Sequence, residues 1–295
     1  MKKTVFVGIL TLTLLLVQKV NAENTPALKT VKSNQDTLYF SPLPTSNTRL
    51  NLVKIQPVAN YLSQILMRPV KPKLYESYRE IIQAMSNNEI QFAELGPLPF
   101  LTLQEKSSYI TPLATVNKVS YNRRYECVLA APSDGIQSIE QLNSLKHPRV
   151  ALTQPDSTCG WLVTHQLLQE HGFDLAKHDY AYLGSQQKVA LALIRKEYSI
   201  GGLARFIAER YQPLGLEILK TSDSMPPFVL VANTQTLSPI ELEKVTQALV
   251  NYQPSLHKDF NSLGFAPYSP ELFTKFKQRY PNRAVPLQSS LGNKP

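Results

Sequence analysis

The hydroxyl-rich segment 156–161, Asp-Ser-Thr-Cys-Gly-Trp, carries residue types that can hold an anion. It follows an apolar run at 150–152, which predicts a buried strand, and it opens a stretch whose apolar residues have helical spacing. The first turn of a helix leaves backbone N–H groups unpaired, and the helix dipole places partial positive charge there. Ser157 and Thr158 add two hydroxyl donors. The segment therefore predicts an oxyanion site. The alternative is an ordinary helix N-cap, which Ser, Thr and Asp also favour.

Short strands and helices alternate along the chain and must position this segment. Such alternation predicts an α/β fold with mostly parallel pairing, in which ligands bind at the carboxyl ends of strands. Loops 41–44, 96–97 and 157–160 each follow a predicted strand, so we expect them to face the ligand. The predicted strands are 38–40, 69–74, 90–95, 110–116, 126–131, 149–152, 180–183, 200–203, 216–219 and 228–232.

The first 22 residues have the features of a secretory signal peptide. Lys2 and Lys3 precede an apolar run at 5–17, and Ala22 ends a small-residue cleavage site. We expect cleavage after Ala22, export to the periplasm if the source is bacterial, and no lipid anchor, because no cysteine lies near the cleavage site. The run is too short for a typical membrane span, and no later stretch approaches the length of one.

The charge and the cysteine content limit which ligands, partners and metals we expect the chain to bind. The net charge of +9 is spread over scattered basic residues, which favours anionic ligands, and no basic stripe with interleaved aromatics indicates nucleic acid. Cys127 and Cys159 are the two cysteines; in an exported protein they predict a disulfide, with two buried free thiols as the alternative. Two cysteines without a histidine cluster make a poor zinc site, and we expect no metal or cofactor.

Several short motifs follow one another in an order typical of a known family. Tyr78 starts a helical stretch, and residues 93–97 read Ala-Glu-Leu-Gly-Pro. Residues 125–129 read Tyr-Glu-Cys-Val-Leu, and 157–160 read Ser-Thr-Cys-Gly. Together with Gly184-Ser185, these motifs resemble the phosphonate, phosphite and phosphate solute-binding proteins of ABC transporters.

The resemblance implies a two-lobed type II periplasmic binding protein, with two mixed, mostly parallel sheets joined by crossing segments near 117–125 and 221–227. The first lobe would comprise 23–121 and 226–295, and the second 122–225. A small anionic ligand would be clamped between the lobes of a monomer that serves an ABC permease and is not an enzyme. The implied ligand-binding residues are Tyr78, Tyr125, Ser157, Thr158, Cys159, Gly160, Ser185 and Arg205.

The chain also departs from the family pattern. Cys127 and Cys159 stand where the family has serines, so the resemblance places them close enough for a disulfide beside the ligand. The acidic residues that hold an amine in aminoalkylphosphonate binders are missing at the matching positions, and Arg205 lies nearby. We therefore expect either an anion other than 2-aminoethylphosphonate, for example one with a second negative group facing Arg205, or an anion site that has drifted from the family pattern. The alternative places Arg205 on a solvated helix face.

Two competing functions remain open from the residues alone. A protein of the same fold could report its ligand to a membrane sensor kinase. A thiol enzyme could use Cys159 at a helix start, with His165 or His171 as the base. His165 is six residues further along the helix and points away from Cys159, and no residue is evidently placed to orient it, which disfavours an enzyme.

Overall fold

The computed structural model describes residues 37–44, 48–118, 125–253, 263–281 and 283. The predicted signal peptide and residues 119–124 of the first predicted crossing segment lie outside these described residues. The described strands form two sheets, which we call the first and the second sheet, and both belong to one unit spanning Gln35–Pro295.

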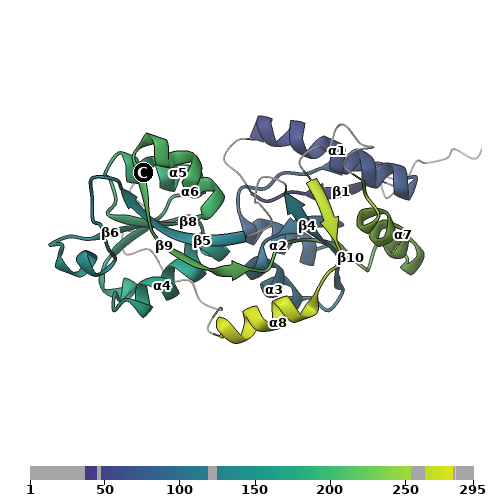
Figure 1. Ribbon diagram of the computed structural model, residues 1–295. Coiled ribbons are helices and arrows are strands. Elements are labelled where there is room, and N and C mark those ends of the chain that lie inside the picture. The colour runs from purple at the N-terminus through teal and green to yellow at the C-terminus, as the bar shows by residue number, and fades with distance from the viewer. Residues whose placement is uncertain (1–36, 45–47, 119–124, 254–262, 282, 284–295) are drawn as a thin grey trace, which may run out of the picture. The chain divides into compact units, whose positions relative to one another are not determined.

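The first sheet has the strand order β11-β4-β10-β3-β1-β2. Figure 1 labels its strands β1, β4 and β10. Its strand β1 pairs in parallel with β2 and β3, whereas β10 is antiparallel to β3 and β4, and β11 is antiparallel to β4. The strands are β1 (Leu38–Ser41), β2 (Val70–Pro72), β3 (Phe92–Leu95), β4 (Ile110–Lys118), β10 (Phe228–Asn233) and β11 (Leu263–Ala266).

The second sheet has the order β7-β6-β8-β5-β9. Its strand β6 is parallel to β7 and β8, whereas β5 is antiparallel to β8 and β9. The strands are β5 (Tyr125–Pro132), β6 (Arg149–Leu152), β7 (Asp179–Tyr182), β8 (Ile200–Ala204) and β9 (Leu216–Met225).

Both sheets are mixed, as predicted, but the expectation of mostly parallel pairing is wrong. The antiparallel ladders are at least as numerous among the described strands, because β5 and β10 run antiparallel to both of their neighbours. The segment 221–227, predicted as a crossing, is mostly strand, since β9 continues to Met225. Met225 is the register partner of Tyr125, so the start of β5 and the end of β9 are paired where the chain passes between the sheets.

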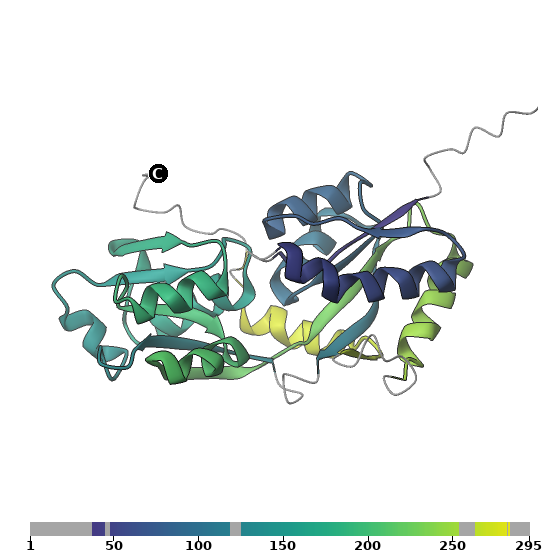
Figure 2. The ribbon, with the colours of Figure 1, turned by 90° about the horizontal axis from the view of Figure 1, so that it is seen from above.

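Five helices accompany the first sheet in the described part of the chain (Figure 2), namely α1 (Thr48–Leu66), α2 (Tyr78–Ser86), α3 (Pro97–Lys106), α7 (Pro239–Val250) and α8 (Pro270–Arg279). The sequence Ser-Pro-Ile-Glu at 238–241 has the spacing of a capping box, and the structure shows this box at the start of α7, with Ser238 and Glu241 as its members. Helix α3 was not predicted from the sequence. Its apolar residues surround the helix axis, and six of its residues are buried, so no amphipathic stripe marks it.

The second sheet carries helical segments on both faces, with α5 and α6 on one face and α4 on the other (Figure 1). They are η3 (Glu140–Ser144), η4 (Thr158–Val163), α4 (Thr164–Glu170), η5 (Leu175–Lys177), α5 (Gln186–Ile194), α6 (Arg205–Tyr211) and η6 (Gln212–Leu214). The helix predicted after segment 156–161 begins with a π-helical turn, η4, and continues as α4. Gly172 follows α4 with a φ of +75°, a conformation in which glycine commonly ends a helix.

Candidate functional site

The first turn of η4 lies at the carboxyl end of β6, as predicted. Ser157 is its N-cap, and the Ser157 Oγ accepts a hydrogen bond from the Gly160 N–H at 3.1 Å. The N-cap interpretation therefore holds for Ser157. Gly160 packs so closely on the end of β6 that a Cβ at this position would lie 1.9 Å from Thr153 Oγ1. Glycine here lets the turn lie directly against the strand end.

Thr158 connects this turn to the first sheet. Its Oγ1 accepts a hydrogen bond from the backbone N–H of Leu98 at 3.1 Å, and both residues are buried. Leu98 lies in the first turn of α3, so the N-terminal ends of α3 and η4 are adjacent. The start of η4 has N–H groups without a carbonyl partner inside the helix and carries partial positive charge, which is a favourable setting for an anion. In the first turn of α3, Pro97 and Pro99 have no N–H, and the Leu98 N–H is already bonded to Thr158. Gly96 permits the approach, because a Cβ there would lie 3.3 Å from Thr158 Oγ1.

Tyr78 is brought to the same region through Gln154. Tyr78 is the first residue of α2, and its backbone N–H donates to Gln154 Oε1 at 3.1 Å. The Gln154 Nε2 donates in turn to the carbonyls of Glu76 and Gly184, at 2.9 and 2.7 Å. Gly184 follows β7, so segments from both sheets converge on one glutamine. Sequence reasoning did not select Gln154, because a single glutamine after a strand carries no motif.

The two cysteines form a disulfide, which confirms that prediction. It joins β5 to η4 with a Cα–Cα distance of 5.0 Å, and both cysteines are buried. The Tyr125 hydroxyl lies 3.3 Å from Cys159 Sγ, and its ring centroid lies 4.7 Å from that of Phe228. Tyr125 and Cys159, two predicted ligand residues, are thus in contact with each other in a buried, largely apolar cluster.

The disulfide also removes the basis of the thiol-enzyme alternative, because Cys159 has no thiol to ionise. His165, one of the two histidines considered as the base, stacks its imidazole ring on Trp161, with ring centroids 5.0 Å apart. Burial in this position lowers the pKa of His165.

Ser185 and Arg205 have other partners. Ser185 is the N-cap of α5 and accepts from the backbone N–H of Lys188 at 3.3 Å. Arg205 begins α6 and makes ion pairs with Glu126 and Glu209, each at 2.8 Å. These two carboxylates hold the Arg205 guanidinium and, through hydrogen bonds, raise its pKa further. The guanidinium is half exposed. This placement corresponds to the solvated helix face given as the alternative for Arg205.

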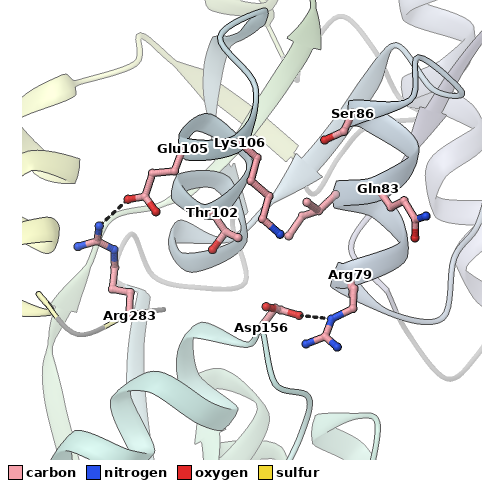
Figure 3. Close-up of a pocket in the computed structure, with 9 residues that line it drawn as sticks. Arg79, Gln83, Ser86, Thr102, Glu105, Lys106, Asp156 and Arg283 are labelled. Carbon is pink, nitrogen blue, oxygen red and sulfur yellow. Dashed lines mark hydrogen bonds and ion pairs between the residues drawn. The ribbon is translucent and has the colours of Figure 1, made fainter. Parts of the chain in front are cut away.

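A cavity of about 490 Å³ lies beside the candidate site (Figure 3). Helices α2 and α3 form its walls, and Asp156, the residue before the N-cap, lies at one side. Arg79 lies 3.5 Å from the Asp156 carboxylate, and Arg283 lies 2.6 Å from the Glu105 carboxylate. The lining is therefore polar and bears charges of both signs. Its residues are Arg79, Ile82, Gln83, Ser86, Thr102, Glu105, Lys106, Asp156 and Arg283.

In the described part of the chain, no group of three or more His, Cys, Asp or Glu side chains is arranged to hold a metal ion. None of the helices in that part of the chain is long and apolar enough to cross a membrane.

Comparison with known proteins gives one family match over most of the chain. The family model for ABC transporter, phosphonate, periplasmic substrate-binding proteins matches residues 40–272. This range contains the whole second sheet and all of the first sheet except the start of β1, and it leaves out only the end of α8 among the described helices. It includes every predicted ligand-binding residue.

Solved structures with the same fold support this match. PhnD1 from Prochlorococcus marinus in complex with methylphosphonate has a TM-score of 0.73 and 16% identity, over 85% of this chain and 100% of that one. A binding protein of an ABC phosphonate transporter from Pseudomonas aeruginosa has a TM-score of 0.71 and 21% identity, over 86% and 91%. XAC2383 from Xanthomonas citri, bound to chloride, has a TM-score of 0.70 and 15% identity, over 84% and 98%. At these identities the structures establish the fold alone.

Proposed function

We propose, from the premise that the chain belongs to the family of periplasmic substrate-binding proteins of ABC phosphonate transporters, that it captures a small oxyanion for an importer. The chain is therefore a binding protein and not an enzyme. The ligand we propose has a tetrahedral anionic head group, as in methylphosphonate, phosphite or phosphate. The partner we propose is the permease of that importer.

The observation that carries this proposal is the meeting of two helix starts at Thr158. The Ser157 and Thr158 hydroxyls each accept a hydrogen bond from a backbone N–H, of Gly160 and Leu98 respectively. A hydroxyl that accepts in this way still has its own O–H to donate. Two O–H donors at the positive end of η4 suit the oxygens of an anion, because hydrogen bonds to a charged acceptor are strong.

We further propose that the two sheets are the cores of two lobes that close on the ligand. The first lobe would comprise 23–121 and 226–295, and the second 122–225. The paired ends of β5 and β9 lie next to the second crossing, at Pro226 and Pro227, and this location suits a hinge. We propose that the exported chain acts as a monomer in the periplasm.

The experiment is a binding screen of the exported chain, residues 23–295, by thermal shift and then calorimetry. The panel contains phosphate, phosphite, methylphosphonate, 2-aminoethylphosphonate, sulfate, a short sulfonate and a dicarboxylate. A ligand at 100 times its Kd stabilises the folded state by about 2.7 kcal/mol. For a chain of this size we expect a rise in Tm of roughly 5–10 °C.

Ser157→Ala tests the site, with Ser238→Ala as the matched control. Both serines are N-caps that accept a hydrogen bond from a backbone N–H three residues on, at 3.1 and 3.2 Å. Each substitution should therefore cost about 1 kcal/mol of stability. Only Ser157→Ala should also weaken binding, by roughly tenfold to a hundredfold, because it removes a donor to a charged ligand. Equal affinities in the two variants, or no Tm shift with any member of the panel, would contradict the proposal.

A further inference from the structure

We propose that Gln154 is a positioning residue that latches segments of the two sheets together and so sets the ligand affinity without touching the ligand. This inference rests on the proposed function, since it concerns the arrangement in which the ligand is held. No motif selects the residue, and its role follows from its hydrogen bonds.

The Gln154 side chain is only 8% exposed and uses both ends of its amide. Its Oε1 accepts from the Tyr78 N–H, and its Nε2 donates to the Glu76 carbonyl. Glu76 and Tyr78 flank the N-cap of α2, which accompanies the first sheet. The second Nε2 hydrogen bond goes to the carbonyl of Gly184, which follows β7 in the second sheet. All three partners are backbone groups.

The hydrogen bonds of Gln154 to Glu76 and Tyr78 favour the arrangement in which segments of the two sheets are joined over the one in which they are separated. When the segments are together, the buried amide and the backbone groups of Glu76 and Tyr78 satisfy one another. When the segments part, water must replace these bonds, so Gln154 contributes most in the joined arrangement. A residue with contacts in one of two arrangements shifts their populations. When the Gln154 contacts are lost, a smaller fraction of the molecules is in the joined arrangement that binds the ligand. The apparent Kd then rises by the factor by which this fraction falls.

Three other polar contacts between the two sides of the described chain are single hydrogen bonds or exposed ion pairs. Thr158 contributes one hydrogen bond, to the Leu98 N–H. The ion pair of Arg279 with Glu170, at 3.3 Å, lies at the surface, where such pairs contribute little. Arg79 is also largely exposed in its pair with Asp156. Gln154, by contrast, is buried and makes two hydrogen bonds across this boundary.

Gln91 provides a matched control. It is 6% exposed, its Oε1 accepts from the Tyr39 N–H at 2.8 Å, and its Nε2 donates to the Asn88 carbonyl at 3.1 Å. These partners all belong to the first sheet and its loops. Gln91→Met and Gln154→Met therefore remove the same kind of buried amide, but only the second removes bonds between the two sides.

The test measures the radius of gyration of the unliganded exported chain by small-angle X-ray scattering, and ligand affinity by calorimetry. We expect Gln154→Met to increase the radius of gyration and to weaken binding of the ligand found in the screen by roughly tenfold to a hundredfold. Gln91→Met should lower the Tm and leave both the radius of gyration and the Kd at wild-type values. An unchanged radius of gyration in Gln154→Met would overturn the proposal.

A second variant keeps the test decisive if Gln154→Met does not fold. In Gln154→Glu the ionised carboxylate would face the carbonyls of Glu76 and Gly184 with no proton to donate. The radius of gyration should therefore be larger than wild type at pH 7.5 and should fall when the carboxylate is protonated at low pH. Absence of this change would also overturn the latch. Scattering needs no ligand, so a failed ligand screen would contradict the proposed function and leave the latch to be judged separately.

Discussion

Residue 160 shows how one side-chain position shapes the candidate site. The carbonyl of Gly160 accepts from the Thr153 N–H at 3.1 Å, and the Gly160 N–H donates to Ser157 Oγ. The backbone of η4 is thereby held against the end of β6. This contact fixes where the Ser157 and Thr158 hydroxyls lie, and it leaves no space for a methyl group.

We predict that Gly160→Ala lowers the free energy of unfolding by at least about 2 kcal/mol. The new Cβ would lie 1.9 Å from Thr153 Oγ1 and 2.5 Å from its Cγ2, so the strand end or the helix start must move. Urea denaturation measures the change. Gly172→Ala is the control, because a Cβ there meets no atom within 4 Å. This variant should lose only about 1 kcal/mol of stability, which is what a φ of +75° costs a residue with a Cβ. Equal losses in the two variants would contradict the steric argument.

At the scale of elements, the disulfide ties strand β5 to the start of η4. The two cysteines are 32 residues apart in the sequence, and β6 and η3 lie in the loop that they close. A bond across a loop of this length restricts the unfolded chain. It also holds the first turn of η4 beside the strand that leads from the crossing, close to Tyr125 and Phe228.

We predict that the double variant Cys127→Ser, Cys159→Ser folds but loses about 3–4 kcal/mol of stability. Urea denaturation with and without dithiothreitol measures this effect. Reductant should lower the stability of the wild-type protein toward that of the variant and should leave the variant unchanged. A wild-type unfolding curve that reductant does not move would show that the bond is absent or contributes nothing.

At the scale of the whole molecule, both the binding function and the disulfide require that the chain is exported. A periplasmic substrate-binding protein must cross the inner membrane, and the oxidising periplasm lets the disulfide form. The predicted signal peptide lies outside the described residues, so its removal stays a prediction from the sequence.

We expect the periplasmic protein to begin at Glu23, because Ala22 ends the predicted cleavage site. Intact-mass measurement of protein from a periplasmic extract determines this terminus. A variant that lacks residues 2–22 should stay in the cytoplasm and keep its cysteines reduced. Recovery of the chain from the periplasm with its first 22 residues attached would contradict the prediction.

Patterns local in the sequence were sufficient for much of the fold. The capping box of Ser238 and Glu241 is read from spacing alone, because its hydrogen bonds join residues three apart. The strand before segment 156–161 and the helix after it were also predicted, since each has its own hydrophobic period. The family, and with it the two-sheet α/β fold, followed from the order of several short motifs.

Contacts between distant segments were decided only by the tertiary structure. The sequence left the state of Cys127 and Cys159 open, because pairing depends on a distance that no spacing fixes. It could not show that Glu126 would hold Arg205, nor that β9 would extend to pair with β5. Gln154 belongs to no sequence motif, because its hydrogen-bond partners are backbone groups of distant residues. They are separated from it in the sequence by 76 residues (Tyr78), 78 residues (Glu76) and 30 residues (Gly184). Local propensity acts over a few residues, whereas register, ion pairs and buried amide bonds exist only once the sheets bring distant residues together.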